Sequence, residues 1–223
     1  MPCWKGSAAT QSVLRAGNDT ATESGALRGG FLVIEGIDGA GKSTLCKMIG
    51  ERLESEGYST VITQEPTYDE IGSFIREDRV AGISQKAEAL LFVADRAVHT
   101  ERISRLVESG NIVICDRYFA STVAYQSSGL GGESVDREWL IELNRPVMIT
   151  PDLTVLLDID PRKGLARIGE RGITSKFEES GYLFDVRMEF LRLAEEFGFM
   201  VVDAEEDPAS IAEKVIKTLK ERI

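Results

Sequence analysis

The chain has 223 residues, 43% hydrophobic and 28% charged, enough to bury one substantial core. Its formal net charge of -11 would repel a nucleic-acid backbone, so we expect no nucleic-acid partner. No apolar run approaches the about 18 residues of a membrane-spanning helix, so we expect no membrane partner either. Cys3, Cys46 and Cys115 lack metal-ligand spacing, which favours reduced thiols and a cytoplasmic protein. A small phosphorylated ligand stays compatible with the charge, because a few cations and N–H groups in a cleft can hold it.

Residues 1–29 are rich in Gly, Ala, Ser and Thr and show no sustained helical or strand period. They lack the apolar region of a secretory signal peptide, and we expect a disordered extension. Their composition also fits an organelle-targeting peptide, a tag remnant or a start codon placed too early. Residues 30–223 contain no internal repeat and no second boundary, which predicts a single domain.

Short apolar runs alternate with longer amphipathic stretches from Phe31 onward, as is typical of a parallel sheet with crossover helices. We expect strands at 31–36, 59–66, 111–116, 153–159 and 199–204. Gly57 and Gly110 are predicted to end two of the helices between them. Two helical stripes are predicted to face the core, formed by Leu45, Met48, Ile49 and Leu53 and by Ala87, Leu90, Leu91 and Ala94. The fold class expected is α/β, a five-stranded parallel sheet with helices on both faces.

The segment GIDGAGKS at 36–43 matches the Walker A pattern, between a predicted strand and a predicted helix. Its glycines let backbone N–H groups surround a β-phosphate, Lys42 reaches the β- and γ-phosphate oxygens, and Ser43 is a ligand for Mg²⁺. We therefore predict the three-layer fold of P-loop NTPases, with ATP as phosphoryl donor and Mg²⁺ as cofactor. The predicted ATP-binding residues are Gly36, Ile37, Asp38, Gly39, Ala40, Gly41, Lys42, Ser43 and Thr44.

A P-loop indicates the nucleotide but not the reaction. A GTPase would need a guanine-reading Asn-Lys-x-Asp segment, and the chain contains none. A small-molecule kinase instead needs an acceptor site and a cationic lid, because positive charge must lie where negative charge develops during phosphoryl transfer. The chain offers candidates for both.

The acceptor site is predicted to begin at Asp116 and Arg117, which follow the apolar run NIVIC and emerge at the carboxyl end of a strand. Arg117 is predicted to bind the acceptor phosphate, and Asp116 to act on the water shell of Mg²⁺. A surface salt bridge that caps the next helix is the alternative. On the preceding helix Phe92 and Arg96 share a face and are suited to stack on a base and donate to it, the alternative being one core and one surface residue.

Positive charge gathers between about 162 and 178, which we predict to be a lid over the phosphates. Its cations are Arg162, Lys163, Arg167, Arg171 and Lys176. An amphipathic helix with a solvated basic face is the alternative. His99, the only histidine, is expected on a helix surface without a catalytic role.

The segments EGIDGAGKST at 35–44, EALLFVADR at 88–96 and DRYFASTVAYQ at 116–126 resemble the three signature blocks of thymidylate kinases, in their usual order. The resemblance covers about residues 30–220. It implies an enzyme that transfers the γ-phosphoryl group of ATP to dTMP, giving dTDP and ADP for dTTP synthesis. It also implies a homodimer formed by helices that flank the acceptor site.

The resemblance further implies that Phe92 stacks on thymine, that Arg96 meets the thymine O4 atom, and that Arg117 contacts the dTMP phosphate. Arg76 is expected to be a second phosphate-binding arginine. The whole set implied for dTMP is Asp38, Arg76, Phe92, Arg96, Arg117, Thr122, Tyr125 and Gln126.

Other roles follow from the same blocks. Thr122 and Gln126 are expected at the pyrimidine edge, and Tyr125 beside the 2' carbon, where it favours deoxyribose. Asp38 is expected near the 3'-hydroxyl and the metal. The predicted metal-binding residues are Ser43, Asp116 and Asp38.

The chain departs from the bacterial pattern Arg-Glu-Pro-Gly-Gly, because it has Gln64 in place of the Arg and Thr67 in place of the first Gly. In this family the catalytic cation comes from the P-loop or from the lid, and the variable P-loop residues Gly39 and Ala40 are neutral here. The lid is therefore expected to supply it, from Arg171 first and Arg167 second. The predicted catalytic residues are Lys42, Arg171, Arg167 and Arg117.

Two alternatives stay open. Another P-loop kinase, acting on a deoxynucleoside or a different nucleoside monophosphate, would differ chiefly in the groups around the acceptor base. A nucleotide-binding regulatory protein would bind ATP without forming dTDP.

Overall fold

The computed structural model describes residues 29–77, 82–129, 134–168 and 176–223. The extension predicted at residues 1–29 lies outside this part of the chain, except for Gly29. None of the helices in the described part combines the length and the apolar character needed to cross a bilayer. Cys46 and Cys115 are buried and free.

A sheet of five parallel strands in the order β2-β3-β1-β4-β5 forms the centre of the molecule. The central strands β1, β3 and β4 are apolar on both faces because helices cover both faces. Each strand overlaps a predicted apolar run, and the predicted α/β fold is confirmed. The strands are β1 (Gly30–Glu35), β2 (Thr60–Gln64), β3 (Ile112–Asp116), β4 (Leu153–Asp158) and β5 (Met200–Asp203).

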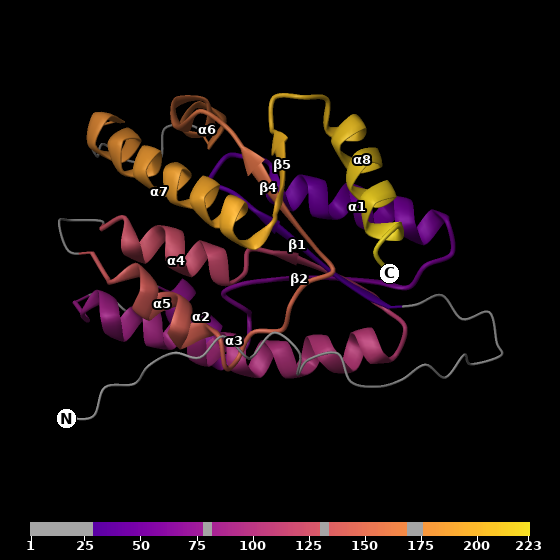
Figure 1. Cartoon of the computed structure of the whole chain (residues 1–223), viewed down its shortest axis with the longest axis horizontal. Coiled ribbons are helices and arrows are strands. Elements are labelled where there is room, and N and C mark those ends of the chain that lie inside the picture. The colour runs from indigo at the N-terminus through magenta and orange to yellow at the C-terminus, as the bar shows by residue number, and fades with distance from the viewer. Residues whose placement is uncertain (1–28, 78–81, 130–133, 169–175) are drawn as a thin grey trace.

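Helices cover the sheet in two layers (Figure 1). The helices α1 and α8 pack together on one face, while α3, α4 and α7 lie on the other. Gly57 and Gly110, with φ of +90° and +86°, follow the ends of α1 and α3, as predicted. The helices are α1 (Lys42–Ser55), α2 (Glu70–Arg76), α3 (Gln85–Glu108), α4 (Phe119–Ser127), α5 (Arg137–Asn144), α6 (Pro161–Ile168), α7 (Lys176–Phe197) and α8 (Pro208–Lys220).

The buried face of α3 differs from the predicted one. Leu90 is 49% exposed, so the predicted stripe through Leu90 does not face the core. The prediction for His99 is also wrong, because this residue is buried with 1% exposure. The inward face carries polar side chains that bond to residues of other segments, and apolar periodicity does not detect such a face. It is formed by Ala89, Val93, Asp95, Arg96, His99, Thr100 and Ile103.

The register of the strands aligns the carboxyl ends of β1, β2 and β3. Asp116 on β3 is the register partner of Ile34 on β1 and of Gln64 on β2. The carboxyl ends of these three strands therefore lie side by side, and the loops that follow them meet at one edge of the sheet.

Candidate active site

The P-loop connects β1 to α1 and folds around the amine of Lys42. Gly41 has φ of +98° and precedes the first residue of α1, so its left-handed conformation turns the chain into the helix. Lys42 is buried, and its Nζ donates to the carbonyl oxygen of Ile37 at 3.0 Å. Burial, with the nearby positive charge of Arg117, lowers the pKa of Lys42 to about 8. A bound triphosphate would counter both effects.

Ser43 and Asp116 form an oxygen pair beside the P-loop. Ser43 Oγ donates to Asp116 Oδ2 at 2.5 Å. Asp116 Oδ1 is buried and has no hydrogen-bond partner among the described residues. A carboxylate oxygen without a partner next to a hydroxyl is the type of ligand set that Mg²⁺ prefers, so these two residues fit the predicted metal.

Arg117 lies between the P-loop and α4. Its Nη2 forms an ion pair with Asp38 Oδ1 at 2.5 Å, and its Nη1 donates to Ser121 Oγ at 3.1 Å. The hydroxyl of Tyr125 donates to Asp38 Oδ2 at 3.1 Å. The Nε–H of Arg117 has no acceptor among the described residues, which leaves a donor for an anion.

Charges in this group influence one another. Burial alone would raise the pKa of Asp38, but Arg117 and Lys42 outweigh burial and lower it. Burial raises the pKa of Tyr125 to about 12 against the opposing charge of Arg117, so its hydroxyl stays a donor at neutral pH. Asp38 is therefore an ionised carboxylate with both oxygens paired, whereas Asp116 has a free oxygen for a metal.

The backbone at Arg117 is held in the left-handed region, with φ of +72°. Glu35, at the end of β1, binds two residues that follow Arg117 in the chain. Its carboxylate accepts from the backbone N–H of Tyr118 at 2.9 Å and from the hydroxyl of Ser121 at 2.6 Å. Such a conformation persists only where the surroundings fix it, and Glu35 supplies these bonds. Burial raises the pKa of Glu35 to about 7, because the bonds from Ser121 and the charge of Arg117 offset only part of the desolvation.

Arg96 marks the other end of the site and is 1% exposed. Its Nε and Nη2 donate to Glu65 Oε2 at 2.8 and 2.6 Å. Its Nη2 also donates to Thr122 Oγ1 at 3.0 Å, and its Nη1 donates to Asn144 Oδ1. The guanidinium lies over the ring of Tyr118, 5.3 Å from the ring centroid. Arg96 is thus a buried cation whose guanidinium is held by hydrogen bonds to Glu65, Thr122 and Asn144.

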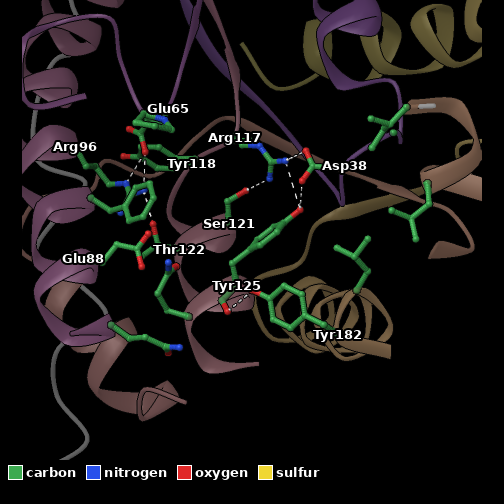
Figure 2. Close-up of a pocket in the computed structure, with 18 residues that line it drawn as sticks. Asp38, Glu65, Glu88, Arg96, Arg117, Tyr118, Ser121, Thr122, Tyr125 and Tyr182 are labelled. Carbon is green, nitrogen blue, oxygen red and sulfur yellow. Dashed lines mark hydrogen bonds and ion pairs between the residues drawn. The ribbon is translucent and has the colours of Figure 1, made fainter. Parts of the chain in front are cut away.

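A cavity of about 710 Å³ connects the two arginines. Figure 2 shows Arg96 with Glu65 and Thr122 on one side, and Arg117 with Asp38 and Tyr125 on the other. The lining also includes the predicted residues Phe92 and Gln126, whose Oε1 is buried without a hydrogen-bond partner in the described chain. The structure therefore brings together, around one cavity, the predicted acceptor residues Asp38, Phe92, Arg96, Arg117, Thr122, Tyr125 and Gln126.

Arg76 is not among the residues that line this cavity. Its Nε donates to the carbonyl oxygen of Thr67 at 3.1 Å, and its guanidinium lies 4.4 Å from the ring centroid of Tyr68. Thr67, at the position of the family glycine, is buried, and its N–H and hydroxyl both donate to Asp95, at 2.7 and 2.6 Å. Asp95 thus anchors the loop that contains the substitution.

The first part of the predicted lid is helix α6, which lies against the P-loop. The Nη1 of Arg167 contacts the carbonyl oxygen of Gly39 at 3.5 Å, and its Nη2 donates to the carbonyl oxygen of Ala204 at 3.2 Å. Arg167 therefore lies between the P-loop and the end of β5. Arg171, predicted as the first catalytic cation of the lid, lies outside the described residues.

Several residues of the site escaped the sequence analysis. Glu35 has a detectable signal, because it is a carboxylate in an apolar run directly before the P-loop. Glu65 and Asn144 have none, since they come from segments far from Arg96 in the sequence. Tyr182 on α7 lines the cavity, and its hydroxyl donates to the carbonyl oxygen of Tyr125 at 2.9 Å.

Comparisons with known proteins point to one family. A profile of the family described as thymidylate kinase matches residues 34–215. A probable thymidylate kinase of Thermococcus kodakarensis is 40% identical over 206 residues, which cover 85% of this chain and 97% of that protein. A probable thymidylate kinase of Methanosarcina barkeri is 38% identical over 200 residues, covering 87% of this chain and 98% of the relative.

A solved structure agrees with these sequence matches. The crystal structure of thymidylate kinase from Ehrlichia chaffeensis superposes with a TM-score of 0.68 and 29% sequence identity, over 88% of this chain and 100% of that one. The α/β fold, the P-loop and the cavity with an arginine at each end are the features described above. The chain belongs to the thymidylate kinase family.

Proposed function

We propose that this enzyme transfers the γ-phosphoryl group of ATP to dTMP, giving dTDP and ADP. The observation that carries the proposal is the single cavity with Arg96 at one end and Arg117 at the other, directly beside the P-loop. A nucleoside monophosphate has a base at one end and a phosphate at the other, so it matches this arrangement of donors. The family membership supports dTMP as the acceptor.

The phosphate end of the cavity orients the acceptor. Arg117 offers its free Nε–H and its Nη groups to the dTMP phosphate, whose oxygen is already ionised near neutral pH. No general base is required for its attack, so catalysis depends on position and charge. Lys42 binds the β- and γ-phosphate oxygens of ATP, and the backbone N–H groups of residues 39–44 surround the β-phosphate.

Mg²⁺, held by Ser43 and Asp116, neutralises charge on the phosphates when it is bound. The lid supplies the remaining cations, Arg171 first and Arg167 second. Arg167 already contacts the P-loop carbonyl of Gly39, so a short displacement of its guanidinium would bring it to the phosphates. Closing the lid excludes water from the transfer.

The base end selects the acceptor. Phe92 offers a ring for stacking, Arg96 an N–H donor for a ring carbonyl, and Gln126 an amide with an unpartnered Oε1. Tyr125, bonded to Asp38, lies beside the sugar and favours deoxyribose by its bulk. We also propose a homodimer in the cytoplasm, which sedimentation analysis and cell fractionation would test.

Initial rates with dTMP, dUMP, dCMP, AMP and thymidine, each with Mg-ATP, test the proposed function. We expect dTMP to give the highest kcat/KM. A preference for thymidine would indicate a nucleoside kinase, and a preference for AMP or dCMP a different monophosphate kinase. ATP binding without any dTDP would indicate a regulatory protein.

A further inference from the structure

We propose that His99 is a positioning residue for base recognition, which acts through Glu65 on Arg96. This inference rests on the proposed function, because it assigns a task to the base end of the same cavity. His99 contributes no atom to the cavity lining. Its effect on the substrate must therefore pass through another side chain.

A chain of hydrogen bonds connects β2 to the cavity through His99. Its Nε2 lies 2.8 Å from Thr63 Oγ1, and its Nδ1 lies 3.0 Å from Glu65 Oε1. The other carboxylate oxygen of Glu65 accepts from Nε and Nη2 of Arg96. His99, Glu65 and Arg96 are all buried, with exposures of 1%, 4% and 1%. Each member of the chain is therefore held on both sides and shielded from water.

The neighbours of His99 fix the donor at its Nδ1. Glu65 pairs with a guanidinium and accepts on both oxygens, so it is a carboxylate, and His99 must carry its proton on Nδ1. The hydroxyl oxygen of Thr63 lies at hydrogen-bond distance from Nε2, on the opposite side of the ring.

The bonds from Glu65 leave Arg96 with a defined donor. A guanidinium has five N–H groups. Those on Nε and Nη2, and one on Nη1, donate to Glu65, Thr122 and Asn144, so a single N–H on Nη1 has no acceptor in the described chain. This group cannot become an acceptor, so it favours a ring carbonyl over a ring amino group. If Glu65 shifts, the guanidinium can rotate and this selectivity falls.

A purely structural role for His99 is the competing explanation, since a buried ring also fills space. The two explanations differ in what they predict for substrate kinetics. A space-filling ring affects stability alone. A positioning ring affects the KM for dTMP and the preference for dTMP over dCMP, which carries an amino group in place of the carbonyl.

Two polar substitutions separate the bonds of His99. In His99→Asn the amide nitrogen takes the place of Nδ1 and keeps the bond to Glu65. In His99→Gln the amide nitrogen takes the place of Nε2, so the bond to Thr63 is kept and the bond to Glu65 is lost. We expect His99→Asn to keep the KM for dTMP within about threefold of wild type, and His99→Gln to raise it about tenfold, with kcat changed less than about threefold. The ratio of kcat/KM for dTMP to that for dCMP should fall only in His99→Gln.

Thr100→Val is the matched control, because it removes a buried hydroxyl that donates to Arg96 and Val147 backbone carbonyls on the same helix. It should lower the melting temperature without changing the dTMP to dCMP ratio. Equal KM values and equal ratios in the two His99 variants would overturn the inference. If neither variant folds, Thr63→Val decides: a KM raised about twofold with a lower ratio supports the inference, and unchanged kinetics contradict it.

The same assays distinguish an error in the proposed function from an error in the role of His99. A wild-type enzyme that forms no dTDP contradicts that function, whatever the variants do. A wild-type enzyme that phosphorylates dTMP, with His99→Gln unchanged in KM and selectivity, contradicts the role of His99 alone.

Discussion

The two arginines of the cavity are held in opposite ways. Arg96 is buried and bonded to Glu65, Thr122 and Asn144, all of which are themselves buried. Arg117 pairs with Asp38, whose side chain is 54% exposed, and keeps its Nε–H free. A fully buried pair fixes a guanidinium in one orientation, whereas the pair of Arg117 and Asp38, with side chains 19% and 54% exposed, can exchange partners at lower cost.

This difference matches the two tasks of the cavity. Recognition of a base requires a hydrogen-bond donor at a fixed position, because a displaced donor would also bond to other bases. Binding a phosphate that must move toward reaction requires charge that can follow it. Stability and activity should therefore separate when the two ends are altered, and the following predictions test that separation.

Arg96→Met should cause the largest loss of stability. The substitution leaves the buried carboxylate of Glu65 without its guanidinium partner, which is expected to lower the free energy of unfolding by about 3 to 5 kcal/mol. Urea unfolding followed by circular dichroism measures the change. A double variant that also carries Glu65→Met should recover part of the loss, because no unpaired charge remains. A loss below about 1 kcal/mol in Arg96→Met would show that the pair is not fixed as described.

Arg117→Met should instead impair activity. We expect kcat/KM for dTMP to fall about 100-fold or more, because a charged donor to the acceptor phosphate is lost. Asp38 stays solvated and bonded to Tyr125, so the free energy of unfolding should change by less than about 1 kcal/mol. Arg145→Met, which removes an exposed pair with Glu142, serves as control and should change neither quantity. Unfolding of Arg117→Met under assay conditions would remove the proposed contrast.

Glu35→Gln tests the Arg117 end of the cavity through the pH dependence of the free energy of unfolding. The pKa of Glu35 is about 7 in the folded protein, above its usual value of 4.5, so the folded state binds the proton more tightly than the unfolded state. The free energy of unfolding contributed by this group therefore falls as pH rises from about 4.5 to about 7 and then levels off. Between pH 5 and pH 8 the wild-type protein should lose about 2 kcal/mol relative to the variant. Urea unfolding of both proteins at the two pH values measures this difference, and an equal change of stability with pH in both proteins would contradict the raised pKa of Glu35.

Tyr125→Phe should have the smallest effect. It removes the hydroxyl that donates to Asp38, whose side chain is partly exposed to water. We expect the KM for dTMP to rise about twofold to threefold and the free energy of unfolding to change by less than about 1 kcal/mol. Tyr58→Phe, near Lys220 and far from the cavity lining, is the control. A large loss of stability in Tyr125→Phe would mean that the phosphate end is as rigid as the base end.

Local patterns were enough to predict the fold and the P-loop. Strand runs, the glycines after α1 and α3, and the segment around Lys42 and Ser43 each depend on neighbouring residues, and the structure places all of them as expected. The inward face of α3 was missed because paired polar groups occupy it. His99 could not be placed from the sequence, since its partners Thr63 and Glu65 lie on another segment.

Contacts between distant segments limited the rest of the prediction. Position after a strand indicated Arg117 and helical spacing indicated Arg96, and the family resemblance gave their roles. No local pattern pointed to Glu65 or Asn144 as partners of Arg96, because both come from segments distant in the sequence. The predicted phosphate contact of Arg76 stays a prediction, because this side chain bonds to the loop at Thr67 in the structure. Arg171 stays a prediction as well.

The close packing of α6 on the P-loop leaves no room for a side chain at position 39. A Cβ atom placed on Gly39, which has φ of +78°, would lie 2.1 Å from the carbonyl oxygen of Gly164. A cation on the P-loop at position 39 would need a side chain there, and in this chain the backbone of α6 fills that space. Gly39→Arg alone should therefore lower the melting temperature, because α6 would have to move to make room for the new side chain.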